Sequence, residues 1–188
     1  MKKDEIRRQA RARKSILSEM ERQVAAVDVF NQLEQMAAFM MADNILIYHS
    51  LPDELSTLDF INKWHTQKQL YLPRVNGSNL DILPYAPSQL KTGAFKIEEP
   101  IGSDTTDISK IELIIVPAMA FDKQGNRVGR GKGFYDRLLA DSRALKIGVA
   151  YDCQIFDNID VDPFDQPVDI VITQSRTYNR QHKHTPAQ

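Results

Sequence analysis

The chain has 188 residues, of which 42% are hydrophobic and 26% are charged, and its formal net charge is −1. This length fits one domain, or one domain with a small appendage, and the hydrophobic share suffices for a core. The nearly neutral charge balance argues against a protein built mainly to coat nucleic acid. The one cysteine, Cys153, cannot form an intramolecular disulfide, which fits a reducing cytoplasm. No long apolar run indicates export or membrane insertion, so we expect a cytoplasmic protein without a membrane partner.

Residues 2–22 are predicted to form one long basic helix, and residues 23–42 a second helix whose apolar side chains face the core. We interpret most cations of the first helix as a solvated face. Lys3 and Arg7 differ, because residues at i and i+4 share one side of a helix. An alternative makes the whole helix a nucleic-acid contact, although no base-reading module follows it. The cations lie in the first fourteen residues, and they are Lys2, Lys3, Arg7, Arg8, Arg11, Arg13 and Lys14.

A short buried strand is predicted over residues 45–48, followed by a polar loop and a helix that runs from an N-cap at Ser56 to Trp64. Loops at the carboxyl ends of strands are where open α/β sheets bind ligands. Glu54 in this loop is either a ligand-binding carboxylate or a first-turn helix residue favoured by the helix dipole. His49 is either a ligand contact or a histidine that merely ends the strand.

A hairpin is predicted next, with strands over residues 70–75 and 80–85 and a turn at Asn76-Gly77. Residues 86–110 contain two prolines and two glycines and are predicted to form a long loop, which in a compact domain is usually functional. Phe95 in this loop either stacks on a flat heterocycle or packs structurally. Arg74 meets an anionic ligand or lies at the surface.

A glycine-rich basic loop follows the apolar strand predicted over residues 113–116. Four of the eight glycines lie between Gly125 and Gly133, and a helical pattern opens at Phe134. A strand, a glycine loop and a helix N-terminus together aim backbone N–H groups at an anion. The loop matches neither a Walker A motif, since Gly133 follows Lys132, nor a dinucleotide fingerprint. We therefore predict a phosphate site, with a solvated basic loop as the alternative.

Two further strands are predicted over residues 146–151 and 168–173, with a turn at residues 162–165 between them. Residues 177–188 are polar and are expected to be a disordered tail, which leaves a single domain over residues 1–176. Strands with helices between several of them predict an α/β fold arranged as a three-layer α/β/α sandwich.

The segment Gly125-Asn126-Arg127-Val128-Gly129-Arg130-Gly131-Lys132-Gly133-Phe134-Tyr135-Asp136 resembles the signature of the 5-formyltetrahydrofolate cyclo-ligase (5,10-methenyltetrahydrofolate synthetase) family. Shorter segments also resemble that family, and they are Lys3-Asp4-Glu5-Ile6-Arg7, Leu51-Pro52-Asp53-Glu54, Ile97-Glu98-Glu99-Pro100 and Phe164-Asp165-Gln166-Pro167-Val168-Asp169. The resemblance implies the fold of ribose-phosphate isomerases and CoA transferases. It also implies ATP- and Mg²⁺-dependent closure of 5-formyltetrahydrofolate to 5,10-methenyltetrahydrofolate, with release of ADP and phosphate. We expect a monomer without a nucleic-acid partner.

The resemblance also implies roles for particular residues. The catalytic residues would be Arg130 and Lys132. ATP would be bound by Lys3, Arg7, Arg127, Gly129, Arg130, Gly131, Lys132, Gly133, Phe134 and Tyr135. The folate would be bound by His49, Glu54, Phe95, Arg130, Gly131, Lys132, Gly133 and Phe134. Mg²⁺ would be bound by Asp136 and Asp165, whose hard oxygen donors suit that ion; the alternatives are a helix-start carboxylate and a turn residue.

The implied chemistry needs no protein nucleophile, because the γ-phosphoryl group activates the formyl oxygen and the substrate's own N10 then attacks. Two readings of another class remain open from the residues alone. A sugar-phosphate isomerase or a CoA transferase on the same fold would use the basic loop without ATP. A non-enzymatic RNA-binding protein would rest on the N-terminal cations.

Overall fold

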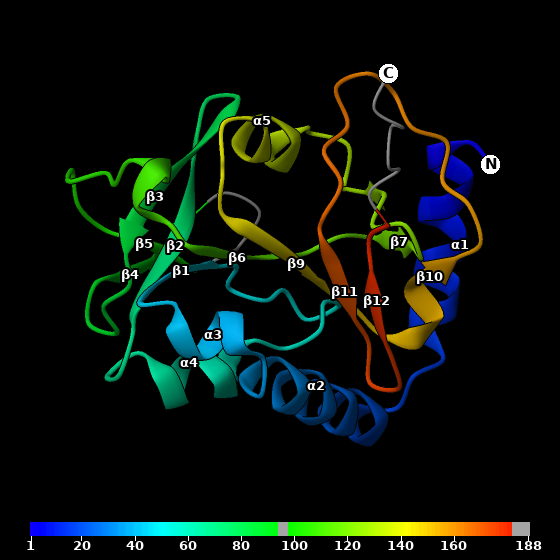
Figure 1. Cartoon of the computed structure of the whole chain (residues 1–188), viewed down its shortest axis with the longest axis horizontal. Helices are drawn as coiled ribbons and strands as arrows, with labels where there is room; N and C mark the ends of the chain where they lie inside the picture. The colour runs from blue at the N-terminus through cyan, green and yellow to red at the C-terminus, as the bar shows by residue number, and fades with distance from the viewer. Residues whose placement is uncertain (94–97, 182–188) are drawn as a thin grey trace, which may run out of the picture.

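A central, mostly parallel sheet organises the chain in the computed structural model, which describes residues 1–93 and 98–181 (Figure 1). Its seven strands have the order β12-β11-β9-β6-β1-β2-β3. The five inner strands pair in parallel, and β12 and β3 join the two edges antiparallel. The structure thus confirms the predicted α/β class with helices between the strands.

The elements have the following bounds. The helices are α1 (Lys3–Ser15), α2 (Glu19–Glu34), α3 (Ala37–Met41), α4 (Leu58–Trp64) and α5 (Phe134–Ala140). The strands of the central sheet are β1 (Asn44–Ile47), β2 (Gln69–Asn76), β3 (Asn79–Pro84), β6 (Leu113–Val116), β9 (Leu145–Val149), β11 (Ile170–Ile172) and β12 (Thr177–Asn179). Two small sheets contain β4 (Leu90–Thr92) with β5 (Glu98–Pro100), and β7 (Ala120–Asp122) with β8 (Arg127–Val128) and β10 (Ile155–Phe156).

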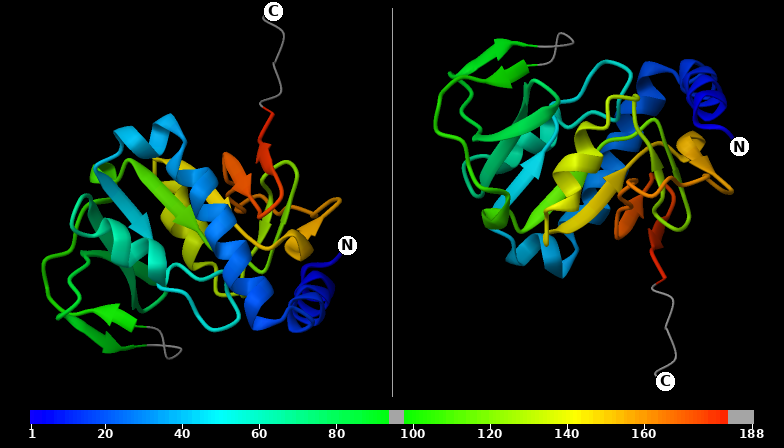
Figure 2. Two further views of the ribbon diagram at one scale, coloured as in Figure 1. Left: turned by 90° about the horizontal axis from the view of Figure 1, so that it is seen from below. Right: turned by 90° about the horizontal axis from the view of Figure 1, so that it is seen from above.

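Both faces of the central sheet are covered, which explains the continuous apolar runs of its inner strands. Successive residues of β1 point to opposite faces: Ile45 and Ile47 belong to one buried cluster and Leu46 to another. Helices α2, α3 and α4 lie over the first face, and α5 lies over the second (Figures 1 and 2). The carboxyl ends of β1 and β6 are adjacent because these strands pair in parallel, with Ile47 beside Ile115. The loops that follow them are therefore neighbours.

The N-terminal region breaks into three helices where two were predicted. The first helix ends at Ser15, and α2 begins after Ser18. The Ser18 hydroxyl accepts a hydrogen bond from the Glu21 amide at 3.1 Å, and the Glu21 carboxylate accepts one from the Ser18 amide at 2.7 Å. This reciprocal capping box favours a new helix start over continuation of the old one. The Ser-x-x-Glu pattern that signals it is present in the sequence.

Other predicted boundaries also change. The segment predicted as one long loop over residues 86–110 contains the β4–β5 hairpin and a short 3-10 helix, Ile108–Lys110. Phe95 lies outside the described residues. Part of the tail expected to be disordered forms β12, which pairs with β11. The N-cap of α4 is Thr57, and the Ser56 hydroxyl accepts from the Leu58 amide at 3.4 Å. The hairpin predicted at Asn76-Gly77 is confirmed.

Two glycines with positive φ provide a matched test of this packing. Gly125 has φ 78°, and a Cβ there would lie 2.2 Å from the Val168 carbonyl oxygen; Gly77 has φ 60° with nothing within 4 Å. We expect Gly77→Ala to lower the free energy of unfolding by about 1–2 kcal/mol, the cost of a left-handed side chain. Gly125→Ala should cost more, because the Val168 backbone must also move. Urea unfolding measures both, and equal losses would contradict the close approach.

Candidate functional site

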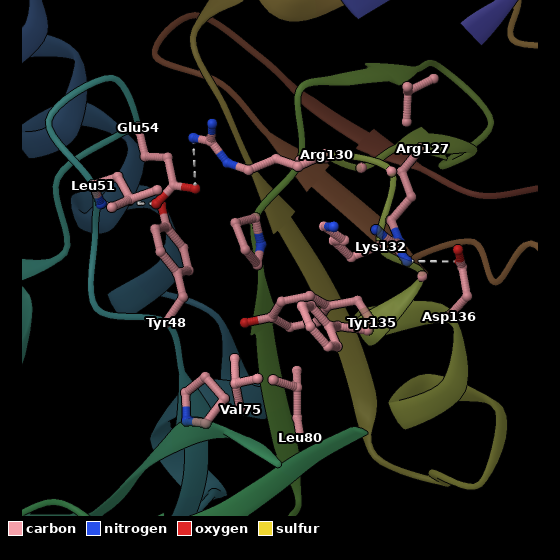
Figure 3. Close-up of a pocket in the computed structure, with 18 of the residues that line it drawn as sticks. Tyr48, Leu51, Glu54, Val75, Leu80, Arg127, Arg130, Lys132, Tyr135 and Asp136 are labelled. Carbon is pink, nitrogen blue, oxygen red and sulfur yellow. Dashed lines mark hydrogen bonds and ion pairs between the residues drawn. The ribbon is translucent and has the colours of Figure 1, made fainter. Parts of the chain in front are cut away.

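A cavity of about 770 Å³ opens where the loops after β1 and β6 meet the β2–β3 hairpin and α1 (Figure 3). It brings together every predicted site residue that the structure describes. These lining residues are Lys3, Arg7, His49, Glu54, Arg127, Gly129, Arg130, Gly131, Lys132, Gly133, Phe134, Tyr135, Asp136 and Asp165. Segments from both ends of the chain therefore meet in one place, as the α/β topology predicts for loops at strand ends.

Arg127 lies in strand β8, where the sequence analysis placed an open loop. Its side chain is only 4% exposed and its guanidinium donates to Asp136 at 2.6 Å and to the Gln166 carbonyl at 3.2 Å. The same Asp136 oxygen accepts from the Gln166 amide at 3.0 Å. Burial lowers the pKa of Arg127, and the Asp136 carboxylate opposes that effect. The pair fixes the start of α5 against the turn before β11.

Helix α1 contributes two cations to the rim of the pocket. The Lys3 ammonium lies 2.5 Å from both Asp162 and Asp165, and the Arg7 guanidinium donates to the Gly129 carbonyl at 2.8 Å. Burial acts to lower the pKa of Lys3, but its hydrogen bonds to the two aspartates outweigh burial and raise it. Burial likewise acts to raise the pKa of Asp165, but hydrogen bonds from Lys3 and the Asp162 amide and the charges of Lys3 and Arg127 together outweigh it and lower the pKa.

Asp136 and Asp165, the predicted metal ligands, both face the pocket, and each is paired with a cation. Within residues 1–93 and 98–181, no group of three or more His, Cys, Asp or Glu side chains is arranged to hold a metal by itself. Mg²⁺ is usually bound by one or two carboxylates together with substrate phosphates and water. These two carboxylates therefore fit a Mg²⁺ ion that arrives with phosphate, and they do not form an all-protein cage.

The loop after β1 reaches across the pocket to the glycine loop. Arg130 donates to Asp53 at 2.7 Å and to Glu54 at 3.1 Å, as the dashed line to Glu54 in Figure 3 shows. The other Glu54 oxygen accepts from the Leu51 amide at 2.8 Å. Glu54 is thus already engaged on both oxygens, although its side chain is at the pocket wall. The two loops form the opposite sides of a single site.

Lys14 is a buried support for this bridge, and the expectation that it belongs to a solvated helix face is wrong. Its side chain is 3% exposed, and its ammonium donates to the Asp53 carbonyl at 2.8 Å and the Asp53 carboxylate at 2.9 Å. Burial acts to raise the pKa of Asp53, but hydrogen bonds from Lys14 and Arg130 outweigh it and hold the pKa below its usual value. Nothing in the sequence around Lys14 separates it from the neighbouring cations. It is buried because the Asp53 loop packs against it in the folded protein.

Lys132 is exposed, and its ammonium has no hydrogen-bond or ion-pair partner in the part of the chain that the structure describes. Gly131 and Gly133 on either side have φ of 107° and 69°, a backbone conformation that favours glycine. Figure 3 shows Lys132 on the side of Arg127 and Tyr135, across the pocket from Glu54. The glycine loop therefore presents an uncompensated positive charge, which an anionic ligand can neutralise.

The opposite wall of the pocket is apolar, and the sequence analysis did not identify it. Val75 and Leu80 are register partners in the β2–β3 hairpin, and both line the cavity. Burial raises the pKa of Tyr135, so its hydroxyl stays neutral. Period-two alternation along β2 would have placed Pro73 and Val75 on one face. The remaining apolar and aromatic lining residues are Tyr48, Leu51, Pro117, Ala118 and Val128.

The two residues left open by the sequence differ in position. His49 lines the pocket, and burial lowers its pKa, which favours the neutral imidazole. Arg74 is not among the lining residues. Its guanidinium donates to the Gly102 carbonyl at 2.6 Å and pairs with Asp81 at 3.4 Å. Arg74 therefore holds the segment after β5 against β2.

A pocket with a basic glycine loop on one side and an apolar wall on the other suits a phosphorylated ligand beside a flat organic one. The model of the 5-formyltetrahydrofolate cyclo-ligase family matches residues 1–174. The chain belongs to this family, which confirms the resemblance found in its sequence. It is therefore an enzyme of folate one-carbon metabolism, in a family of ATP-dependent ligases.

Individual relatives agree with this assignment. A 5-formyltetrahydrofolate cyclo-ligase of Escherichia coli K12 is 35% identical over 149 residues, which cover 74% of this chain and 82% of the relative. The Haemophilus influenzae relative is 31% identical over 182 residues, covering 91% and 97%. The solution structure of Aquifex aeolicus 5,10-methenyltetrahydrofolate synthetase matches over 100% of both chains with a TM-score of 0.86 and 31% identity. None of the helices in residues 1–93 and 98–181 is long and apolar enough to cross a bilayer.

The Lys14–Asp53 pair generates a stability prediction. Asp53→Asn should lower the free energy of unfolding at pH 7 by about 1 kcal/mol, because it weakens a hydrogen bond to the buried Lys14, while solvent screens the half-exposed Asp53. The folded-state pKa of Asp53 is depressed, so its stabilisation is present above the unfolded pKa and is lost as pH falls below 3.8 toward the folded value. The difference between wild type and variant should therefore shrink below pH 3.8.

Urea unfolding at pH 7 and at acidic pH measures this difference. Asp157→Asn is the control, because Asp157 is an exposed carboxylate. A difference between wild type and Asp53→Asn that stays constant as the pH falls would show that the Asp53 charge does not stabilise the loop.

Proposed function

We propose that this pocket closes 5-formyltetrahydrofolate to 5,10-methenyltetrahydrofolate by an ATP- and Mg²⁺-dependent reaction that releases ADP and phosphate. The observation that carries the proposal is that the uncompensated cation of the glycine loop and an apolar wall suited to a flat ring line the same cavity. Family membership supports the substrate and the product.

The chemistry explains why the pocket contains cations and no nucleophile. A formamide oxygen is a poor leaving group, so it first attacks the γ-phosphorus of ATP and ADP leaves. The N10 nitrogen of the same folate then attacks the activated formyl carbon, and the carbon–oxygen bond breaks with inorganic phosphate as the leaving group. N10 loses its proton as the ring closes. The protein's task is to position two substrates and to stabilise the charge of the moving phosphoryl group.

Each cation has a role in this scheme. Lys132 and Arg130 contact the transferring phosphoryl group, because they belong to the glycine loop and face the cavity. Arg127, Lys3 and Arg7 support ATP binding from the buried end and the rim. The remaining ATP contacts are Gly129, Gly131, Gly133, Phe134 and Tyr135. Asp136 and Asp165 hold Mg²⁺, which when bound neutralises phosphate charge.

The folate lies against the loop after β1 and the β2–β3 hairpin. Glu54 and His49 bind the folate from the side of the β1 loop. Phe134 and the glycine loop contact the formyl end of the folate. Phe95, which the resemblance implies for the folate site, lies outside the described residues. Glu54 must exchange its Arg130 contact for a substrate donor, so folate binding would release this guanidinium toward the phosphates.

The same reasoning extends to the architecture and the setting of the protein. Helices on both faces of the sheet support a three-layer α/β/α sandwich like that of ribose-phosphate isomerases and CoA transferases. We expect a cytoplasmic monomer. A nucleic-acid role is disfavoured, because Lys3, Arg7 and Lys14 of α1 are engaged inside the protein.

The test of the function is an absorbance assay. Near-ultraviolet absorbance should rise when 5-formyltetrahydrofolate is added with ATP and Mg²⁺, because the methenyl product carries a conjugated formamidinium system. Omission of either ATP or the folate should abolish the rise. A rise without ATP, or none with all components present, would reject the proposal.

Replacement of Lys132 tests the catalytic role of the glycine loop. Lys132→Met keeps the aliphatic stem and removes the charge, so kcat should fall by about 10²–10³-fold, the range for losing one preorganised stabilising group. ATP affinity should fall much less, because Arg127 and the glycine amides still hold the ground state. Lys123→Met, at an exposed lysine in the β7–β8 turn, is the control. Near wild-type kcat in a folded Lys132→Met enzyme would show that Lys132 is a solvated loop cation.

The metal assignment predicts a double effect for Asp136→Asn. The Mg²⁺ concentration for half-maximal activity should rise, because one carboxylate ligand is lost. The free energy of unfolding should also fall by about 3 kcal/mol, because the buried Arg127 loses its charged partner. Mg²⁺ titrations and urea unfolding separate the two effects, with Asp141→Asn at the other end of α5 as the control. An unchanged Mg²⁺ titration would remove Asp136 from the metal site.

A further inference from the structure

Glu99 is a further carboxylate at the pocket, and it takes no part in the proposed phosphoryl transfer. Glu99 is 5% exposed and yet lines the cavity. One of its oxygens accepts from the Val75 amide at 3.2 Å. Among residues 1–93 and 98–181, no lysine, arginine or histidine forms an ion pair with it. Glu99 belongs to the segment Ile97-Glu98-Glu99-Pro100, which resembles a motif of the family. The resemblance implies no role for this glutamate.

The local structure turns Glu99 inward and its neighbour outward. Strand β5 pairs antiparallel with β4, and successive strand residues point to opposite faces. The Glu98 carboxylate accepts from the Thr92 hydroxyl at 3.2 Å, and Glu98 does not line the cavity. The guanidinium of Arg74 donates to Gly102 just beyond β5. That contact fixes β5 beside β2, where Glu99 meets the amide of Val75.

The surroundings of Glu99 make it an unusual structural residue. Burial of a carboxylate is costly unless it is fully hydrogen-bonded or paired with a cation. The apolar wall beside it, Pro73, Val75 and Leu80, offers only the one backbone amide. A neutral glutamine would accept from Val75 equally well without a buried charge. The second Glu99 oxygen lies against Gly93, where a Cβ would overlap it, and the residue borders the cavity. N–H donors of a bound ligand would complete the hydrogen bonding of this carboxylate.

The position of Glu99 distinguishes it from Glu54. Glu54 lies beside Arg130, whereas Val75 and Leu80 lie at the other end of the cavity in Figure 3. Both Glu54 oxygens already have partners, whereas Glu99 accepts one hydrogen bond within the described residues, from the Val75 amide. We propose that Glu99 accepts the N–H donors of the amino-pyrimidinone ring of the folate, an inference that rests on the proposed function. The ring then packs on Val75 and Leu80, and its reacting formyl end points to Arg130 and Lys132.

The test compares Glu99→Gln with Glu98→Gln, a matched change at the adjacent residue outside the cavity. The dissociation constant for 5-formyltetrahydrofolate, measured by calorimetry without ATP, should rise by about 10- to 100-fold for Glu99→Gln, the loss of a charge-assisted hydrogen bond. Glu98→Gln should change it much less, because Glu98 does not line the cavity and its carboxylate bonds to the Thr92 hydroxyl instead. ATP affinity should be unchanged in both variants, because the glycine loop lies across the cavity.

A substrate analogue without the 2-amino group identifies the donor. For the 2-desamino analogue, wild type and Glu99→Gln should differ by less than about threefold, because the hydrogen bond is already absent. Equal weakening of both ligands by Glu99→Gln, or no weakening of either, would overturn the assignment. Thermal melting checks folding, and Glu99→Asp, which keeps the charge and shortens the reach, replaces Glu99→Gln if that variant does not fold. A wild-type protein that does not bind 5-formyltetrahydrofolate would instead reject the proposed function, and this inference with it.

Discussion

The ion pairs of Arg130 with Asp53 and Glu54 hold the site together, because they join the loop after β1 to the glycine loop between β8 and α5. Parallel pairing of β1 and β6 brings the segments that follow these strands to the same edge of the sheet, but it does not fix the distance between the two loops. The bridge does so, and Lys14 supports it from beneath with a buried ammonium group on Asp53. The Arg130 bridge and the buried Lys14 beneath the Asp53 loop thus define the width of the pocket.

The charge distribution follows from this arrangement. Lys3 and Arg127 are each paired with aspartates, so their charges are largely balanced within the protein. Lys132 has no such partner in the described residues. It lies between two glycines with positive φ, Gly131 and Gly133, and a β-branched residue at either position would be strained. A phosphate group that enters the pocket therefore meets one uncompensated cation and several fixed ones. This combination needs little reorganisation during phosphoryl transfer, which is the condition for electrostatic catalysis.

Sequence patterns predicted much of the fold because the inner strands are strongly apolar and the hairpin carries an Asn-Gly turn. The glycine stretch and its resemblance identified most of the residues that line the pocket. The capping box at Ser18 indicates a new helix start, but the apolar spacing around it favours a first helix that continues to residue 22. The burial of Lys14 could not be read in this way, because it depends on a contact with Asp53, far away in the chain. Alternation along β2 places Pro73 and Val75 on one face, but it does not show that this face lines a pocket.

The central claim is that the enzyme activates the formyl oxygen as a phosphate ester before the ring closes. The most direct measurement is the fate of that oxygen when 5-formyltetrahydrofolate labelled with ¹⁸O in the formyl group is converted completely in unlabelled water. If the formyl oxygen attacks the γ-phosphorus, the label must appear in the inorganic phosphate, with one ¹⁸O atom in each phosphate released. Unlabelled phosphate, with ¹⁸O found in water, would show that ATP is cleaved without phosphorylating the substrate and would contradict the account.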